Sequence, residues 1–192
     1  MKFFTYKLIA AANGWGRETL EEQRTAIDLF ERAVKTYHRH LDRRRPKVPA
    51  AAWRFFRHGD PENTLHDARL INMTIGDIPM RLGSSSKGRR PFTTRVRLEF
   101  LTHAEDQLYV FECSRIHSIE SNLFVPTRER GLDDVYTYEL CCAPKQRLTL
   151  NFLFVTGATI TVQFDRLRFR RRILKRKGRS VQRWIKWTRL SV

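Results

Sequence analysis

Residues 147–169 read RLTLNFLFVTGATITVQFDRLRF, and this stretch decides the fold class. Apolar side chains occupy every second position from Leu148 to Phe154, and again from Ile160 to Phe164. This alternation predicts strands over residues 147–155 and 158–169, with a hairpin turn at Thr156-Gly157 between them. After Asp165 the apolar residues move to odd positions, which predicts either a bulge or the end of the sheet there.

Four more segments upstream of this hairpin have the composition and alternation of strands. They cover residues 65–78, 92–101, 107–119 and 134–142. No helical crossover segment separates one predicted strand from the next, so we expect an antiparallel sheet. The segment Trp53–Arg57 and the turn at residues 58–61 come before the first strand, and we assign no helix or strand to them.

A long amphipathic helix is predicted over residues 19–44. Its apolar residues recur at intervals of three, four and seven. Thr19 followed by Glu22 is a capping-box start, and Pro46 ends the helix. The apolar stripe consists of Leu20, Ile27, Phe30, Val34, Tyr37 and Leu41.

The predicted fold class is therefore α+β, with the long N-terminal amphipathic helix packed on an antiparallel β-sheet. A chain of 192 residues fits one ordinary domain. We assign residues 1–165 to this single domain, β-rich over 65–165, and residues 166–192 to a basic C-terminal arm.

The positive charge of the chain is concentrated in that arm. The whole chain has 37 Lys and Arg against 20 Asp and Glu, a net charge of +17. Residues 166–192 hold twelve of the basic residues and no acidic one, which leaves 25 basic against 20 acidic residues in 1–165. Such a segment repels itself unless an anion neutralises it, and arginine suits phosphate. The predicted polyanion-binding residues, including two tryptophans that could stack on bases, are Arg166, Arg168, Arg170, Arg171, Arg172, Lys175, Arg176, Lys177, Arg179, Arg183, Trp184, Lys186, Trp187 and Arg189.

The cysteines and the N-terminus indicate where the protein works. Cys113, Cys141 and Cys142 are too few, and odd in number, for a secreted disulfide framework. Lys7 divides the apolar N-terminal run, so we expect no signal peptide. No stretch has the roughly 18 apolar residues of a membrane helix. We therefore expect a cytoplasmic protein with no transmembrane segment.

The sequence predicts no catalytic residue, no metal ligand and no cofactor. His66-Asp67 is also found in metal-dependent HD phosphohydrolases, but those need further His and Asp ligands on helices, and the remaining histidines lack metal-ligand spacing. A structural role for this pair at the start of the sheet is the favoured interpretation. The alternative to a protein without a catalytic site is a cleft formed by the carboxylates of Glu99, Glu112, Glu120 and Glu139.

Three short stretches resemble a group of uncharacterised bacterial α+β proteins. They are Leu65-His66-Asp67-Ala68-Arg69 with the residues after it, Tyr136-Thr137-Tyr138-Glu139-Leu140, and the opening Met1-Lys2-Phe3-Phe4-Thr5. Some of these proteins are similar to immunity proteins, which shield bacteria from contact-delivered toxins. The resemblance implies an α+β fold and a binding role, and it supplies no catalytic residue. The basic arm departs from that pattern.

Together these features predict a non-enzymatic interaction protein whose basic arm binds a polyanion, with nucleic acid as the first choice. The alternative is an immunity-type protein that binds an acidic partner protein or toxin. The two differ in salt dependence, because phosphate contacts weaken steeply with salt and an apolar protein interface does not.

Overall fold

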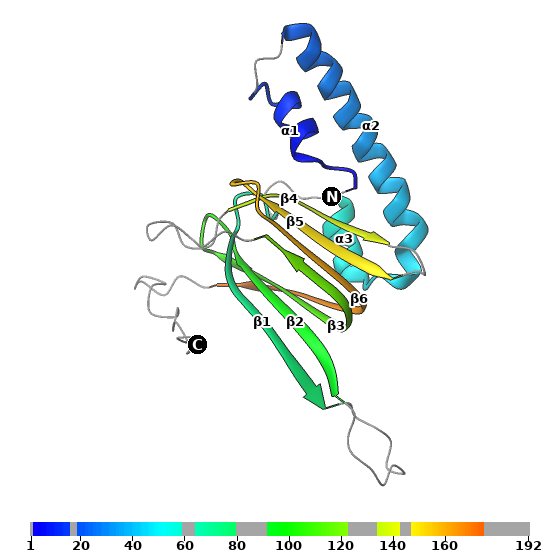
Figure 1. Cartoon of the computed structure of the whole chain (residues 1–192), viewed down its shortest axis with the longest axis vertical. Coiled ribbons are helices and arrows are strands. Elements are labelled where there is room, and N and C mark those ends of the chain that lie inside the picture. Colours follow the sequence, from blue (N-terminus) through cyan, green and yellow to red (C-terminus); the bar gives the residue numbers. More distant parts are fainter. Residues whose placement is uncertain are drawn as a thin grey trace.

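The structure is a computed structural model, which describes residues 2–15, 19–58, 64–79, 92–122, 134–142 and 147–174. Helices α1 (Tyr6–Ala12), α2 (Leu20–Arg44) and α3 (Ala50–His58) come first, with a short 3-10 turn, η1 (Arg45–Lys47), after α2. Six strands follow: β1 (Arg69–Pro79), β2 (Phe92–Leu101), β3 (Gln107–Ser121), β4 (Val135–Cys142), β5 (Leu148–Phe154) and β6 (Thr159–Ile173). Helices α1 and α2 lie at the upper end of the sheet in Figure 1. The α+β class is confirmed.

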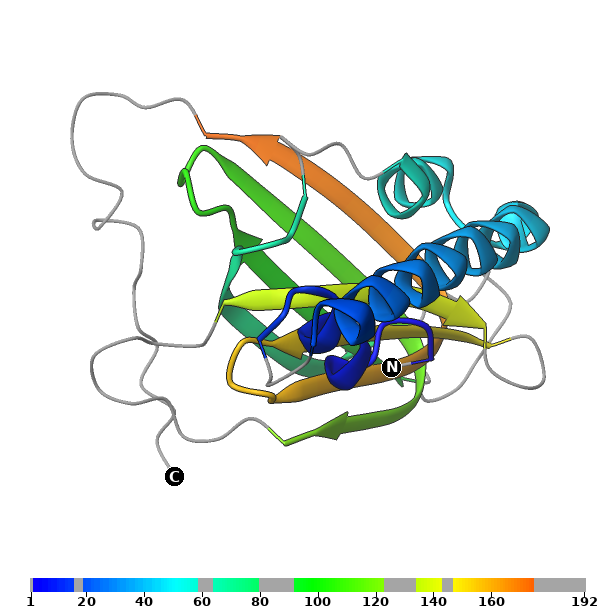
Figure 2. The ribbon, with the colours of Figure 1, turned by 90° about the horizontal axis from the view of Figure 1, so that it is seen from above.

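The strands form one antiparallel sheet with the order β1-β2-β3-β6-β5-β4. The sheet curls, and a bridge between Arg69 and Asp134 joins the beginning of β1 to the beginning of β4 (Figure 2). Rings from distant strands therefore meet inside the curl: Phe100 of β2 and Phe152 of β5 lie 4.6 Å apart between centroids. The core is the concave side of this sheet.

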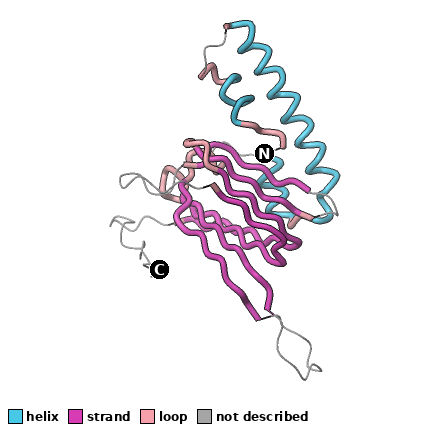
Figure 3. The backbone as a smooth tube through the Cα atoms, viewed as in Figure 1, coloured by secondary structure: helices cyan, strands magenta, loops and turns pink. Residues whose placement is uncertain are grey.

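The outer side of β4 and β5 is covered by the N-terminal part of the chain. Helices α1 and α2 form a hairpin whose lower half lies against the sheet and whose upper half extends beyond it (Figure 3). The Thr19–Glu22 capping box is present and Arg44 is the last residue of α2, as predicted. Phe4 packs edge-on against Tyr37, with their ring centroids 5.0 Å apart, which fixes the N-terminal segment to α2.

Helix α3 was not predicted, although it includes the segment Trp53–Arg57. It is only nine residues long, and the spacing of apolar residues in so short a segment does not separate a helix from a strand. Its packing gives the reason for the helix. Phe55 lies between rings of three strands, with centroids 4.8 Å from Phe169, 5.1 Å from Tyr109 and 5.5 Å from Tyr138.

Most strand boundaries lie within two residues of the predicted ones, and two differ by more. β2 spans 92–101 as predicted, whereas β1 begins at Arg69 because residues 66–67 form a turn in which Asp67 has a φ of 59°. The second difference is at the end of β6. This strand passes Asp165 and the predicted end at residue 169 and continues to Ile173, paired with β3 along its whole second half.

The predicted start of the arm at residue 166 is therefore wrong, because Arg166–Arg172 belong to the sheet. The sheet does not end near Asp165, and a bulge, the other predicted cause of the change of parity, lies close to it. The bulge lies on β3, where the pairing shifts between Ile116 and Ser118, opposite Phe164 and Gln163. The remaining basic residues of the predicted arm, from Lys175 to Arg189, lie outside the described residues.

Candidate anion-binding face

The outer sides of β2, β3 and the second half of β6 carry a set of charged residues that we call the arginine face. Alternation along β6 sends Leu167 and Phe169 into the core and the residues between them outward. Strand register then aligns these residues with those of β3 and β2, in rows such as Arg95–Ser114–Arg166 and Arg97–Glu112–Arg168. The face consists of Arg95, Arg97, Arg166, Arg168, Arg170 and Arg172, together with Glu99 and Glu112.

Arg97 is the neutralised member of the face. Its Nη1 donates to Glu112 Oε1 at 2.8 Å and its Nε donates to Glu99 Oε1 at 2.8 Å. Asn72 on β1 donates to the other oxygen of Glu99 at 3.1 Å. The hydrogen bond to Glu99 is the main reason that the pKa of Arg97 lies above its ordinary value. Both carboxylates of the face are therefore occupied by one guanidinium.

The other arginines of the face are weakly paired or unpaired within the described part of the chain. Arg168 Nη1 lies 3.9 Å from Glu112 Oε2, which is too long for a hydrogen bond, and its side chain is 64% exposed. Arg95, Arg166, Arg170 and Arg172 have no carboxylate within ion-pair distance there. Six arginines against two glutamates give this face an excess of four positive charges.

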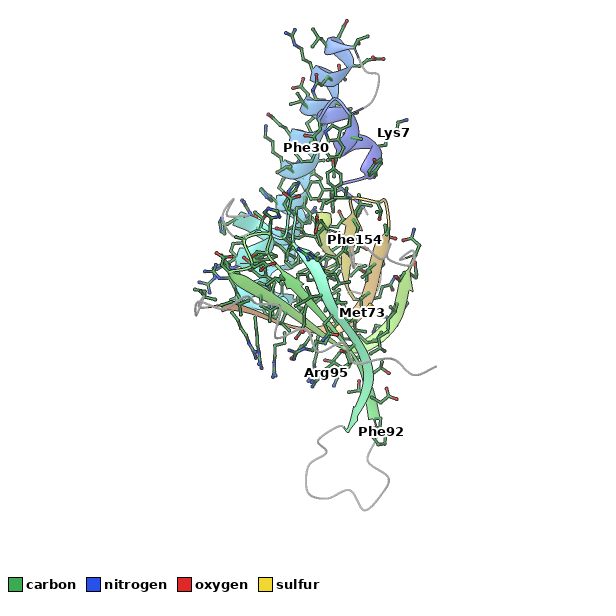
Figure 4. The ribbon with its side chains drawn as sticks, turned by 90° about the vertical axis from the view of Figure 1, so that its left-hand side faces the viewer. Lys7, Phe30, Met73, Phe92, Arg95 and Phe154 are labelled. Atoms are coloured by element: carbon green, nitrogen blue, oxygen red, sulfur yellow. The ribbon has the colours of Figure 1, made fainter. Side chains whose placement is uncertain are left out.

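A shallow depression of about 240 Å³ opens on the face between β2, β3 and β6. Figure 4 labels Arg95 at this end of the sheet, far from Lys7 and Phe30 of the helical hairpin. The depression is lined by Arg95, Glu112, Ser114, Arg166, Leu167 and Arg168. The residues around this volume therefore carry three guanidinium groups, one hydroxyl and one carboxylate.

The structure brings together only part of the predicted site. Arg166, Arg168, Arg170 and Arg172 share the outer side of β6, whereas Arg171 alternates to the other side. The predicted residues from Lys175 onward lie outside the described range. Sequence reasoning missed Arg95 and Ser114, which register places beside Arg166. For Arg95 the available signal was the alternation that places Val96, Leu98 and Phe100 on one face of the strand and Arg95 on the other.

The four carboxylates proposed as a possible cleft do not act as one group. Glu99 and Glu112 share Arg97 on the arginine face. Glu139 lies under the N-terminal segment, fully buried, where it accepts hydrogen bonds from the backbone N–H groups of Lys2 and Phe3 and from Asn151 Nδ2. Its role in the structure is to hold the N-terminal segment on the sheet.

The three cysteines are buried or half-buried, and His40 and His66 have polar partners in the part of the chain that the structure describes. Burial raises the pKa of the Cys113 and Cys141 thiols. Burial also raises the pKa of the Cys142 thiol, and His40 Nε2 accepts the backbone N–H of Cys142 at 3.1 Å. His66 Nδ1 lies 2.9 Å from Asp67 in the turn before β1. No group of three metal-ligating side chains occurs among the described residues.

Comparisons with family models, with curated proteins and with solved structures found no match for this chain. None of the helices in the described ranges is long and apolar enough to cross a membrane.

Proposed function

We propose that this protein is a non-enzymatic binder of nucleic acid, which it contacts through the arginine face. The observation that carries the proposal is the row of four arginines on alternate positions of β6. Among the described residues only Arg168 has a carboxylate within ion-pair distance, Glu112 at 3.9 Å. Alternate residues of a strand are about 6.6 Å apart. A nucleic acid strand lying along β6 can present successive phosphates to such a row.

The chemistry of the face favours contacts to the backbone of the nucleic acid over contacts to its bases. Arginine forks bind phosphate oxygens in pairs. The residues that make up the arginine face include no aromatic side chain on which a base could stack. Binding should therefore depend little on base sequence and strongly on salt.

The basic residues from Lys175 to Arg189 would add to this electrostatic attraction. The three free thiols Cys113, Cys141 and Cys142 support a reducing compartment, the cytoplasm.

A second candidate function is binding of an acidic partner protein. It is favoured by apolar side chains exposed on and beside the α1–α2 hairpin, where Leu20 is 77% and Trp15 is 59% exposed. Such an interface would use an apolar centre and would be less sensitive to salt. It would also leave the arginine face without a role.

The experiment compares two triple variants of the full chain that lose the same charge. One replaces Arg166, Arg170 and Arg172 by glutamine, and the control replaces Arg24, Arg32 and Arg54, which are exposed on α2 and α3. Binding to mixed-sequence single-stranded RNA and duplex DNA is measured by fluorescence anisotropy from 50 to about 300 mM salt.

The face variant should lose at least about tenfold in affinity at low salt, and its slope of log K against log salt should fall by about 3. The control should keep a slope close to that of the unmodified chain. Equal losses in the two variants, or no binding by the unmodified chain, would contradict the proposal.

A further inference from the structure

We propose that the depression between β2, β3 and β6 is a binding site for a single phosphate group, held by Arg95, Arg166 and Arg168 with the hydroxyl of Ser114 at its floor. This inference rests on the proposed function, because it names the point on the arginine face at which one phosphate is bound most closely. The other arginines of the arginine face then attract the neighbouring phosphate groups of the polyanion.

The register of the strands creates the site. Arg95, Ser114 and Arg166 are direct partners in one row across β2, β3 and β6. Neighbouring strands are about 4.8 Å apart, so the two arginines start roughly 10 Å apart with Ser114 midway. An arginine side chain is long enough for both guanidinium groups to reach an anion above Ser114. The hydroxyl of Ser114 has no hydrogen-bond partner among the described residues, and it can donate to such an anion.

Arg168 completes the site because it is held only loosely. It belongs to the next row, where Glu112 already accepts a hydrogen bond from Arg97 at 2.8 Å. The 3.9 Å separation between Arg168 and Glu112 leaves the Arg168 guanidinium able to turn toward the depression. Since its side chain is 64% exposed, this movement displaces no packed residue.

The charges around the depression match a phosphate. Four arginines (Arg95, Arg97, Arg166 and Arg168) and two glutamates (Glu99 and Glu112) give a local excess of two positive charges. A phosphodiester carries one negative charge, and a phosphate monoester carries up to two near neutral pH. Arg97 is a positioning residue, because it neutralises both carboxylates and thereby lowers their repulsion of the anion.

The volume also suits this ligand. A space of about 240 Å³ corresponds to about eight water molecules at roughly 30 Å³ each. This is enough for one phosphate group with a few waters. The site thus recognises the phosphate, and the attached sugar and base extend away from the sheet.

The test uses the full chain and observes the arginine Nε–H resonances by NMR during titration with sodium phosphate at constant ionic strength. Resonances of Arg95, Arg166 and Arg168 should shift and saturate together, and chloride should not reproduce the shifts. Arg95→Gln should weaken phosphate binding by about tenfold or more, since it removes a charge-assisted hydrogen bond. Arg95→Lys should restore part of the affinity, Ser114→Ala should weaken binding less, and Arg32→Gln on α2 should have no effect.

Two further ligands identify the source of the phosphate. A nucleoside 5′-monophosphate offers a monoester, and an oligonucleotide with 5′-hydroxyl and 3′-hydroxyl ends offers only diesters. Tighter competition by the oligonucleotide, compared per phosphate, supports a backbone phosphate as the natural ligand, and the reverse order supports a terminal or small-molecule phosphate.

Failure of this site is distinguishable from failure of the proposed function. If Arg95→Gln binds inorganic phosphate as the unmodified chain does, or if chloride produces the same shifts, the phosphate site is wrong even when the oligonucleotide still binds. If phosphate saturates the site but no oligonucleotide binds at any salt concentration, the site holds and the nucleic-acid proposal fails.

Discussion

Two side chains of α2 accept hydrogen bonds from backbone N–H groups of β4, at the edge of the sheet. β4 is the last strand in the sheet order, so alternate N–H groups point away from β5. The N–H of Leu140 donates to Tyr37 Oη at 3.0 Å, and the N–H of Cys142 donates to His40 Nε2 at 3.1 Å. Two side chains one turn apart on α2 thus accept the hydrogen bonds that the carbonyl groups of a neighbouring strand would otherwise accept.

This arrangement predicts a pH dependence of folding stability. Burial, followed by the nearby charges of Lys2, Arg44 and Arg43, holds the pKa of His40 below its ordinary value of 6.5. As pH falls through 6.5 the unfolded chain therefore takes up a proton before the folded chain does. The free energy of unfolding then decreases with falling pH until the folded pKa is passed.

In His40→Gln the amide oxygen can still accept the N–H of Cys142, so the loss of stability between pH 8 and pH 5.5 should be smaller than in the unmodified chain. Urea unfolding at the two pH values measures it. Tyr37→Phe is the control: it leaves a buried N–H unpaired, which costs about 1–3 kcal/mol at both pH values. Some pH dependence will remain in His40→Gln, because the pKa of His38 is also lowered by burial. Identical losses in His40→Gln and the unmodified chain would contradict the assignment.

At the scale of elements, α2 shows that one apolar stripe can have two environments. The stripe runs the length of the helix, yet Leu41 is 1% exposed and Leu20 is 77% exposed. Only the lower half of α2 reaches the sheet, and the upper half lies beside α1 (Figure 1). The same pattern of residues therefore stabilises the fold at one end of the helix only.

Leu41→Ala should lower the free energy of unfolding by about 2–5 kcal/mol, because it leaves a cavity between α2 and the sheet. Leu20→Ala, the same change in the same helix, should alter it by less than about 0.5 kcal/mol. Thermal and urea unfolding of the two variants measure the difference. A similar large loss in Leu20→Ala would show that the exposed end of the stripe is covered in solution.

At the scale of the whole molecule, the fold and the candidate site depend on the same strand. β6 lies in the interior of the sheet order, between β3 and β5. Its Leu167 and Phe169 belong to the core, while the arginines that alternate with them form the binding face. The backbone that carries these arginines is paired with β3 throughout.

Two truncated chains test whether the folded domain ends at residue 165 or at residue 174. A chain of residues 1–165 should fail to fold, because it lacks the half of β6 that pairs with residues 107–114 of β3. A chain of residues 1–174 should fold, and it should retain nucleic-acid binding with a smaller salt slope than residues 1–192. Circular dichroism and the anisotropy titration measure both outcomes. A folded 1–165 chain would show that the second half of β6 is not needed by the sheet.

The sequence by itself determined the elements whose signals are local. The capping box at Thr19 and the alternation in residues 92–101 and 148–164 specify α2, β2, β5 and the start of β6, because each pattern matches one backbone period. Tertiary structure decided the rest. α3 forms because Phe55 packs among rings from three strands, and β6 continues to Ile173 because β3 offers a partner through Ser114 and beyond. The candidate site likewise needed strand register, since only hydrogen bonding across β3 brings Arg95 and Arg166, 71 positions apart in sequence, to opposite sides of Ser114.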